Sequence, residues 1–464
     1  MFSVRRRGIA RLAAATAVTG LVAAGAIAVA GPAVADETPE GTGGATATLG
    51  DLKIYDKVKI KGRERAISAG LFEMQVTPGG SIQTYCIDLY TGAKTGEEYK
   101  EVGWDQSSLH DNKDAGKIRW ILQNSYPQVN DLDALAKKVG AASLTEKTAA
   151  AATQAAIWHF SDDVEAMPVD ADAKKLTKYL EKKAKNLEEP KASLSLSPSS
   201  VAGKAGERLG PITVDTNAEK ATVSLAPGAP AGVKIVDKDG KVVSDAANGD
   251  QLFLDVPGGT ADGAAEIDVK ADTTVPIGRA FVSTKVKSQT LILAGTSTST
   301  VAAKASATWA TKGPIPAVSA EKNCAKGGVD ITASNEGDED FVFELKGEKY
   351  TIPAGQSKTV TIPVAEDEAY DFTITGPNGF EKNFKGVLDC ETATPGPLPS
   401  ETPETPEPSD SPSPATAGGN TTGGDLAETG SSSATPMIAG IAVVLVVLGG
   451  GAVFFLRRKK AVGQ

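Results

Sequence analysis

Hydrophobic periodicity separates the body of the chain into a first block of mixed character and two later blocks with strand-like patterns only. In the first block, residues 48–190, short alternating runs precede segments in which apolar residues recur every three to four positions. This pattern is typical of strands followed by helices. The clearest strand is 81–90, which places Ile82 and Cys86 on one face and Tyr85 on the other. The first block is therefore predicted to have an α+β fold.

Helices are predicted over 114–123 and 131–139, and over a longer Ala-rich run that follows them. Ser143 and Glu146 have the spacing of a capping box at the start of this Ala-rich run. A strongly charged segment, 172–188, carries leucines along one stripe and is predicted to form a fourth helix.

Helical periodicity disappears after the first block. In residues 191–312, short runs of Val, Ile, Leu and Thr alternate with Gly-containing turns, at a spacing typical of an immunoglobulin-like β-sandwich. Residues 318–391 repeat this pattern as a smaller β-sandwich, which contains Cys324 and Cys390 close to its two ends. The strands predicted in these two blocks are 192–196, 212–214, 221–225, 233–236, 251–256, 265–270, 280–285, 290–294, 329–333, 341–345, 359–362, 370–375 and 384–388.

The N-terminal end has the three parts of a secretory signal peptide. Arginines between Arg5 and Arg11 precede an apolar run, 12–30, and small residues lead up to Ala35. Residues 1–35 are therefore predicted to direct export and to be cleaved after Ala35. The alternative is an uncleaved membrane anchor.

The C-terminal end carries a second apolar run, 437–456, and a basic tail, 457–464. A helix of this length spans about 30 Å, the thickness of the hydrocarbon layer of a membrane. The run is therefore predicted to be a transmembrane helix with its basic tail in the cytoplasm. Before it, residues 392–425 are rich in Pro and then in Gly and Thr, which favours an extended stalk over a packed core.

A pentapeptide, 426–430, lies between the stalk and the apolar run, and consists of Leu426, Ala427, Glu428, Thr429 and Gly430. The pentapeptide, apolar run and basic tail together resemble a sortase sorting signal of the LAxTG type, in which Ala replaces the more common Pro. The resemblance implies that a sortase cuts after the threonine and joins it to peptidoglycan. The alternative is a simple membrane anchor, and both place the body of the protein outside the cell.

Composition excludes several classes of partner. The chain has 48 basic and 58 acidic residues, a net charge of −10, and its body has no basic block of the kind that binds nucleic acid. Two histidines and three scattered cysteines do not form the spacing of a zinc site, so no metal or cofactor is expected. Aromatic residues make up only 5% of the chain, which suits surface β domains better than a large enzyme core.

Three cysteines cannot all pair within one chain. Cys324 and Cys390 bracket one small domain of an exported protein and are predicted to form a disulfide, worth about 4 kcal/mol in the chain-entropy model. Cys86 is then left over. An odd cysteine in an exported protein forms an intermolecular bond, stays buried and inert, or is reactive.

Two short motifs favour a reactive Cys86. Cys86 lies in the sequence Tyr-Cys-Ile-Asp, and Gln154 lies in the sequence Thr-Gln-Ala-Ala-Ile-Trp on the Ala-rich helix. Both motifs resemble those of the thioester domains of Gram-positive surface adhesins. The resemblance implies that the thiol of Cys86 is joined to the side-chain carbonyl of Gln154, with loss of ammonia. Asp88, Thr153 and Trp158 are candidate supports of this site.

The expected protein is thus multidomain, with an α+β thioester domain, two β-sandwich domains, a Pro-rich stalk and a C-terminal transmembrane helix. Its expected function is that of a wall-anchored adhesin that acylates an amine on a host, a neighbouring cell or the matrix. It would react once per molecule and would not be a turnover enzyme. Two alternatives stay open. One is a non-covalent wall protein with an inert Cys86. The other is an exported cysteine acyltransferase or hydrolase in which Cys86 acts with His159.

Overall fold

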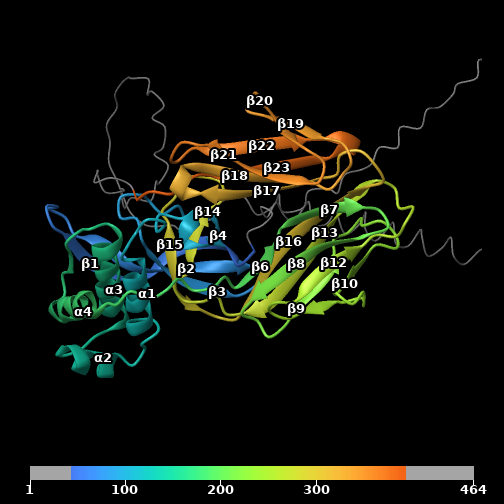
Figure 1. Cartoon of the computed structure of the whole chain (residues 1–464). Helices are drawn as coiled ribbons and strands as arrows, with labels where there is room; N and C mark the ends of the chain where they lie inside the picture. Colours follow the sequence, from blue (N-terminus) through green and yellow to red (C-terminus); the bar gives the residue numbers. More distant parts are fainter. Residues whose placement is uncertain (1–42, 393–464) are drawn as a thin grey trace, which may run out of the picture. The chain divides into compact units, whose positions relative to one another are not determined.

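The computed structural model describes residues 43–392 (Figure 1). The predicted signal peptide, sorting signal, apolar run 437–456 and basic tail lie outside the described residues, as does all but the first residue of the predicted stalk. Among the described residues, no helix is long and apolar enough to cross a membrane.

The first domain is built on a seven-stranded antiparallel sheet in the order β2-β3-β15-β14-β4-β1-β5. β1 also pairs with β2, so the strands from β2 through β1 close into a barrel and β5 extends it beside the end of β1. The strands are β1 (Thr46–Ile60), β2 (Ile67–Thr77), β3 (Ser81–Cys86), β4 (Glu98–Val102), β5 (Ala166–Pro168), β14 (Ala280–Ser283) and β15 (Leu291–Thr296).

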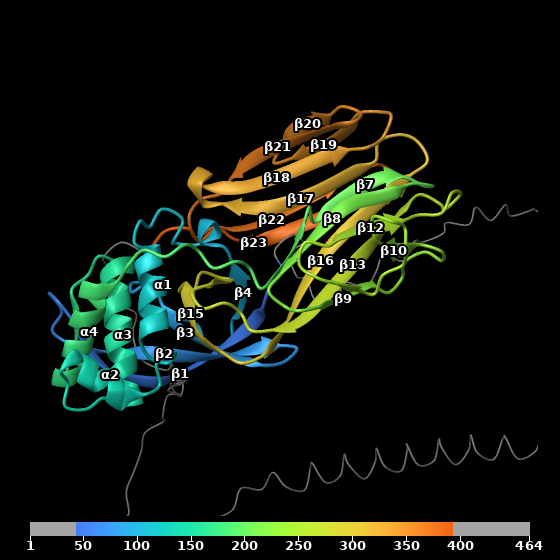
Figure 2. The ribbon, with the colours of Figure 1, turned by 60° about the horizontal axis from the view of Figure 1, so that its bottom comes forward.

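Four α-helices pack on this barrel, together with the short η1 (Trp104–Gln106): α1 (Ala115–Asn124), α2 (Leu132–Val139), α3 (Glu146–Ser161) and α4 (Ala171–Lys183). Figure 2 shows α3 lying between α1 and α4. Every residue of α3 from Ala149 to Trp158 is buried, because its run of small side chains lets strands and helices approach it closely. The α+β prediction is confirmed for this domain. The capping box at the start of α3 is formed by Thr145 and Thr148, and not by Ser143 and Glu146 as predicted.

The predicted domain boundary at residue 190 is wrong for two strands. The segments 280–285 and 290–294 were expected in the first sandwich, but β14 and β15 complete the barrel. β15 pairs directly with β3, with Leu291 opposite Cys86. The alternation of apolar residues predicts a strand without naming its neighbour, so it could not show that the chain returns to the first domain. Most of the sandwich, residues 194–273, is therefore inserted between elements of the barrel domain, and the chain returns to the sandwich after β15 for a last strand, 299–310.

The inserted domain is a β-sandwich of a four-stranded sheet, β10-β12-β8-β6, and a five-stranded sheet, β11-β9-β13-β16-β7. These two sheets agree with the β-rich fold predicted for this block, although β7, β11 and the long strand β16 were not predicted. Its strands are β6 (Leu194–Ser197), β7 (Ser200–Lys204), β8 (Arg208–Thr216), β9 (Ala221–Leu225), β10 (Lys234–Val236), β11 (Asp245–Ala246), β12 (Gln251–Asp255), β13 (Gly263–Thr273) and β16 (Ser299–Ala310).

A buried ion pair lies where the chain leaves and re-enters the barrel. Arg279, just before β14, donates from Nε to Glu101 Oε1 at 3.0 Å and from Nη1 to Glu189 at 2.7 Å. Glu101 also accepts backbone hydrogen bonds from Ala45 and Ser193, each at 3.0 Å. This network joins the start of the described chain, β4, the segment that leads into the sandwich at Ser193, and the segment that returns to β14.

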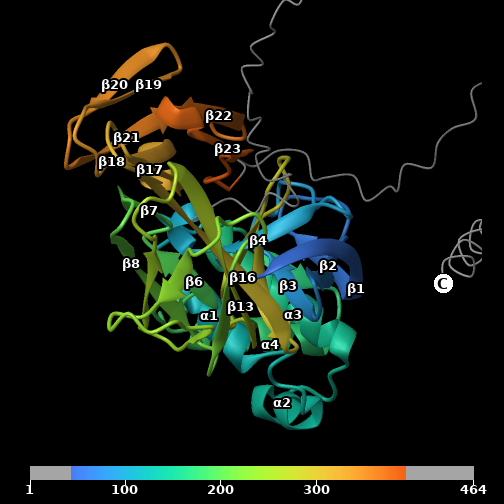
Figure 3. The ribbon, with the colours of Figure 1, turned by 90° about the vertical axis from the view of Figure 1, so that its right-hand side faces the viewer.

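The third domain consists of a three-stranded sheet, β17-β18-β21, and two strand pairs, β19-β20 and β22-β23 (Figure 3). The predicted disulfide between Cys324 and Cys390 is present, with a Cα–Cα distance of 5.3 Å. The elements are β17 (Pro316–Asn323), η2 (Cys324–Lys326), β18 (Gly328–Asn335), β19 (Phe341–Leu345), β20 (Glu348–Ile352), β21 (Gln356–Pro363), β22 (Ala369–Thr375), η3 (Pro377–Gly379) and β23 (Glu381–Val387).

Candidate functional site: a buried cysteine between two glutamines

Cys86 is the last residue of β3 and is 4% exposed. The predicted alternation of this strand is confirmed, because Cys86 and Ile82 belong to one hydrophobic cluster and Tyr85 to another. Burial raises the pKa of the Cys86 thiol, and the nearby carboxylates of Asp88 and Asp162 raise it further. The thiol therefore keeps its proton near neutral pH.

Gln154 reaches Cys86 from α3, as the two motifs predicted, but it contacts the backbone. Its Oε1 accepts a hydrogen bond from Cys86 N at 3.0 Å, and its Nε2 donates to Cys86 O at 2.8 Å. The amide of Gln154 thus satisfies both peptide groups of a buried residue at the end of a strand. This is the geometry of a support for Cys86, whereas the resemblance implied that the side-chain carbonyl of Gln154 is joined to the thiol.

The side-chain amide at the sulfur belongs to Gln289, in the loop before β15. Gln289 Oε1 lies 2.6 Å from Cys86 Sγ. Hydrogen bonds between two oxygen atoms are already about 2.5–3.0 Å long, and sulfur is larger than oxygen, so this separation is too short for an ordinary thiol–amide contact. In a thioester, a C=O bond of about 1.23 Å and a C–S bond of about 1.8 Å meet at roughly 120°, which separates sulfur and oxygen by about 2.6 Å.

The loop that carries Gln289 is fixed at several points. Gln289 N donates to Gly92 O at 3.2 Å, and the side-chain Nε2 donates to the backbone oxygen of Asp88. The hydroxyl of Tyr99, on β4, lies 3.0 Å from Gln289 O and 2.7 Å from Ser288 Oγ. These bonds leave the Gln289 side chain facing Cys86.

Two carboxylates flank the site. Asp88, which was predicted to support it, is 1% exposed, and its backbone oxygen holds the Gln289 amide nitrogen. Asp162, at the C-terminal end of α3, accepts hydrogen bonds from Leu89 N at 2.8 Å and from Ser161 Oγ at 2.6 Å. Burial raises the pKa of Asp162 to about 7, so it titrates close to physiological pH.

The two other predicted supports have different surroundings. Thr153 donates to Ala149 O at 2.8 Å within α3 and lies 2.7 Å from the hydroxyl of Ser125, so it ties α3 to the end of α1. Trp158 follows Gln154 by one helical turn, is 3% exposed and belongs to the same hydrophobic cluster as Cys86. Its ring nitrogen has no hydrogen-bond partner among the described residues.

His159 does not form a catalytic pair with Cys86. Its ring meets the edge of Phe160 at 4.7 Å between centroids. Five residues separate His159 from Gln154 along α3, a rotation of about 140° about the helix axis, so the two side chains lie on different faces of the helix. Within residues 43–392, no hydrogen bond joins His159 to Cys86.

Three carboxylates of the third domain, those of Glu366, Asp367 and Asp389, come within 4.8 Å of one another. Two of them already have partners. Asp367 forms an ion pair with Lys287, and Glu366 accepts from Cys390 N at 2.8 Å. The group therefore holds the end of the third domain to the loop before Gln289.

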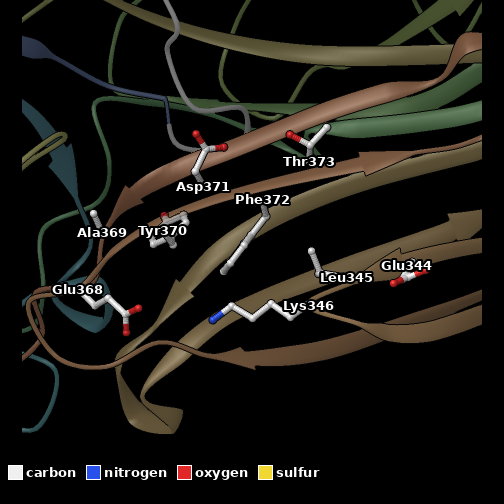
Figure 4. A pocket seen from close by; sticks show the side chains of 9 residues that line it. All are labelled: Glu344, Leu345, Lys346, Glu368, Ala369, Tyr370, Asp371, Phe372 and Thr373. Atoms are coloured by element: carbon white, nitrogen blue, oxygen red, sulfur yellow. The ribbon is translucent and has the colours of Figure 1, made fainter.

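The third domain also has a hollow of about 290 Å³ between the end of β19 and β22 (Figure 4). Its lining includes the aromatic rings of Tyr370 and Phe372 and the charged side chains of Glu344, Lys346 and Asp371. The ammonium group of Lys346 lies over the ring of Phe372, 5.2 Å from its centroid. This hollow is separate from the Cys86 site, which belongs to the barrel.

Two family models match parts of the chain. Residues 83–186 match the family model of the thioester domain, and residues 316–387 match that of the bacterial phospholipase C C-terminal domain. No curated protein matches the sequence.

Two solved structures are similar to parts of the chain. The Bacillus anthracis TIE protein is 15% identical, with 75% of this chain and 81% of that protein covered and a TM-score of 0.27. The thioester domain of the Enterococcus faecium TIE86 protein is 19% identical, with 59% of this chain and 100% of that domain covered and a TM-score of 0.28.

Proposed function

We propose that this protein, which carries a thioester domain, is a surface adhesin in which Cys86 forms an internal thioester with Gln289. The observation that carries the proposal is the distance of 2.6 Å between Cys86 Sγ and Gln289 Oε1, which is that of sulfur and oxygen in a thioester. Gln154 then supports the cysteine backbone and is not consumed.

Thioester formation needs the thiol sulfur to add to the side-chain carbonyl carbon of Gln289. The C–N bond of the amide then breaks, and the thiol proton leaves with the amide nitrogen as ammonia. An amide is a poor acyl donor, but holding both reactants in place is worth about 7–11 kcal/mol of the barrier. The buried position of both side chains also keeps water from the product.

The thioester then acylates an amine. The amine nitrogen adds to the carbonyl carbon, the C–S bond breaks, and an amide on Gln289 and a free Cys86 thiol result. An ordinary lysine, with a pKa of about 10.4, is neutral for only about 0.04% of the time at pH 7, so a proton acceptor is useful. Asp162, whose pKa burial raises to about 7, is suited to this role. Because the acyl group is used up, each molecule reacts once.

The two ends of the sequence support display on the cell surface. Residues 1–35 resemble a signal peptide, and the LAxTG pentapeptide 426–430 with its apolar run and basic tail resembles a sortase signal. We infer export, attachment to peptidoglycan by a sortase, and a target that carries amines on a host, a neighbouring cell or the matrix. Such a protein forms a covalent bond to that target.

The test is the intact mass of the purified exported chain. Loss of ammonia lowers the mass by about 17 Da, and methylamine then raises the mass of the thioester form by about 31 Da. Gln289→Ala should abolish the mass loss and leave an alkylatable Cys86. Gln154→Ala is the matched control, because it removes the other glutamine amide at Cys86 and should still permit the mass loss. Full sequence mass in the wild-type protein, with a thiol that alkylates at once, contradicts the proposal.

A cysteine hydrolase is the weaker alternative, since His159 lies on a different face of α3 from Gln154, the residue that holds Cys86. It predicts continuous turnover of a small ester, lost in His159→Ala. The thioester proposal predicts a single burst that is unchanged in this variant.

A further inference from the structure

We propose that Tyr99 is a positioning residue for the thioester reaction, because its phenol fixes the main chain of Gln289 through a short chain of hydrogen bonds. This inference rests on the proposed thioester. Tyr99 is on β4, is fully buried, and contacts the loop before β15. Its hydroxyl bonds to Ser288 and Gln289, so it acts on the reaction through Gln289.

The direction of the hydrogen bonds follows from counting protons. Tyr99 has one hydroxyl proton, and Gln289 O, at 3.0 Å, can only accept it. Ser288 Oγ, 2.7 Å away, also accepts from the Tyr99 hydroxyl, so the two oxygens share this one proton. Ser288 Oγ in turn accepts from Lys94 N at 3.0 Å. These hydrogen bonds connect Lys94, Ser288, Tyr99 and Gln289.

The Tyr99 hydroxyl can donate these hydrogen bonds only while the phenol is protonated. Burial raises the pKa of Tyr99 above its ordinary value, so the phenol remains a donor throughout the physiological range. Ser288 and Gln289 are both buried, so water does not offer substitute hydrogen bonds.

The bonds matter because Gln289 lies in a loop and its side chain has several rotatable bonds. A misplacement of about 1 Å in a reacting group costs on the order of a hundredfold in rate. Gln289 N is held by Gly92 O, and Gln289 O is held by Tyr99, so both main-chain groups of the residue are anchored. With the main chain fixed, the side-chain amide needs only its bond to Asp88 O to face Cys86.

A second buried tyrosine, Tyr85, provides a matched control. This tyrosine is also fully buried, precedes Cys86 on β3, and donates its hydroxyl proton to Tyr126 O at 2.8 Å. Among the described residues, no hydrogen bond joins its hydroxyl to Gln289. Tyr99→Phe and Tyr85→Phe therefore remove the same atom from two buried tyrosines beside one site, and only the first frees Gln289.

The experiment compares the exported chain in wild-type, Tyr99→Phe and Tyr85→Phe forms. The thioester fraction is followed by intact mass during a pulse-labelled expression, and the melting temperature is measured in parallel. Tyr99→Phe should slow thioester formation at least tenfold, while Tyr85→Phe matures at the wild-type rate with a similar fall in melting temperature. Equal maturation of all three forms overturns the inference, as does equal slowing in both variants.

Ser288 provides a second arm. Ser288→Ala should slow maturation as Tyr99→Phe does, Ser288→Thr should restore it because the hydroxyl is kept, and the double variant should be no slower than either single one. The two proposals fail differently. A wild-type chain that never loses about 17 Da contradicts the thioester itself. A Tyr99→Phe chain that matures normally, beside a Gln289→Ala chain that does not, contradicts only the role of Tyr99.

Discussion

Gln154 holds Cys86 by both of its peptide groups, accepting from Cys86 N at 3.0 Å and donating to Cys86 O at 2.8 Å. Gln154→Ala leaves these two buried groups without partners, at a cost of about 1–3 kcal/mol each. We expect a clearly lower melting temperature and slower reaction with methylamine, but a thioester that still forms. Thermal unfolding and intact mass measure the two effects separately.

A charge variant sharpens this prediction. Gln154→Glu keeps an acceptor for Cys86 N but places an oxygen against Cys86 O, so it should destabilise the protein at least as much as alanine does. A Gln154→Ala protein that lacks the mass loss, although it is folded, would return the acyl role to Gln154.

The second prediction concerns pH. The pKa of Asp162 is raised from 3.8 to about 7 in the folded protein by burial. Between about pH 4 and pH 7 the folded state therefore keeps a proton that the unfolded state has lost, and stability falls as pH rises through this window. Asp162→Asn removes this pH-dependent contribution to stability and keeps an acceptor for Leu89 N. The variant should gain stability relative to wild type from pH 4 to pH 7, with no further gain above that.

Burial also raises the pKa of Asp389 to about 7, but Asp389 is present in both the wild-type and the Asp162→Asn protein. The difference in stability between the two proteins therefore reports on Asp162 alone. Asp163→Asn, which alters the exposed neighbouring residue, serves as the control and should follow the wild-type curve. A pH-independent difference between Asp162→Asn and wild type would show that Asp162 is ionised throughout.

The third prediction concerns the buried ion pair between Arg279 and Glu101. Arg279→Met leaves the Glu101 carboxylate buried without its partner, and breaking such a pair costs about 3–5 kcal/mol. The loss should appear as a lower midpoint in urea unfolding, and Glu101→Gln in the same chain should recover part of it. Lys61→Met is the control, because Lys61 and Glu165 form an exposed pair worth at most about 1 kcal/mol.

Sequence patterns predicted those parts of the structure that depend on residues close together in the chain. The strand that carries Cys86, the helix that carries Gln154, and the disulfide between Cys324 and Cys390 each follow from residues close to one another or from counting cysteines. The motif resemblance correctly brought Cys86 and Gln154 together.

The residue that sequence reasoning missed is Gln289. It lies 203 residues after Cys86, beyond an inserted domain, and no periodicity indicates that β15 returns to pair with β3. One signal was present in the sequence. Ser288, Gln289 and Thr290 are three consecutive polar residues directly before an apolar run, and all three are buried. Buried polar side chains usually have hydrogen-bond partners, which Ser288 finds in Lys94 and Tyr99 and Gln289 finds in Cys86 and Asp88.

The disulfide near the end of the described chain has a mechanical consequence. Tension applied beyond Cys390 passes through the sulfur atoms to Cys324 and on into β17, so the third domain between them carries none of it. Reduction would place a segment of 66 residues in the line of force, and at about 3.3–3.6 Å per residue it would add about 220–240 Å of extension. Single-molecule stretching should show this step only after reduction. While the disulfide is intact, the two cysteines stay 5.3 Å apart between their Cα atoms, so the length of chain between them does not respond to tension.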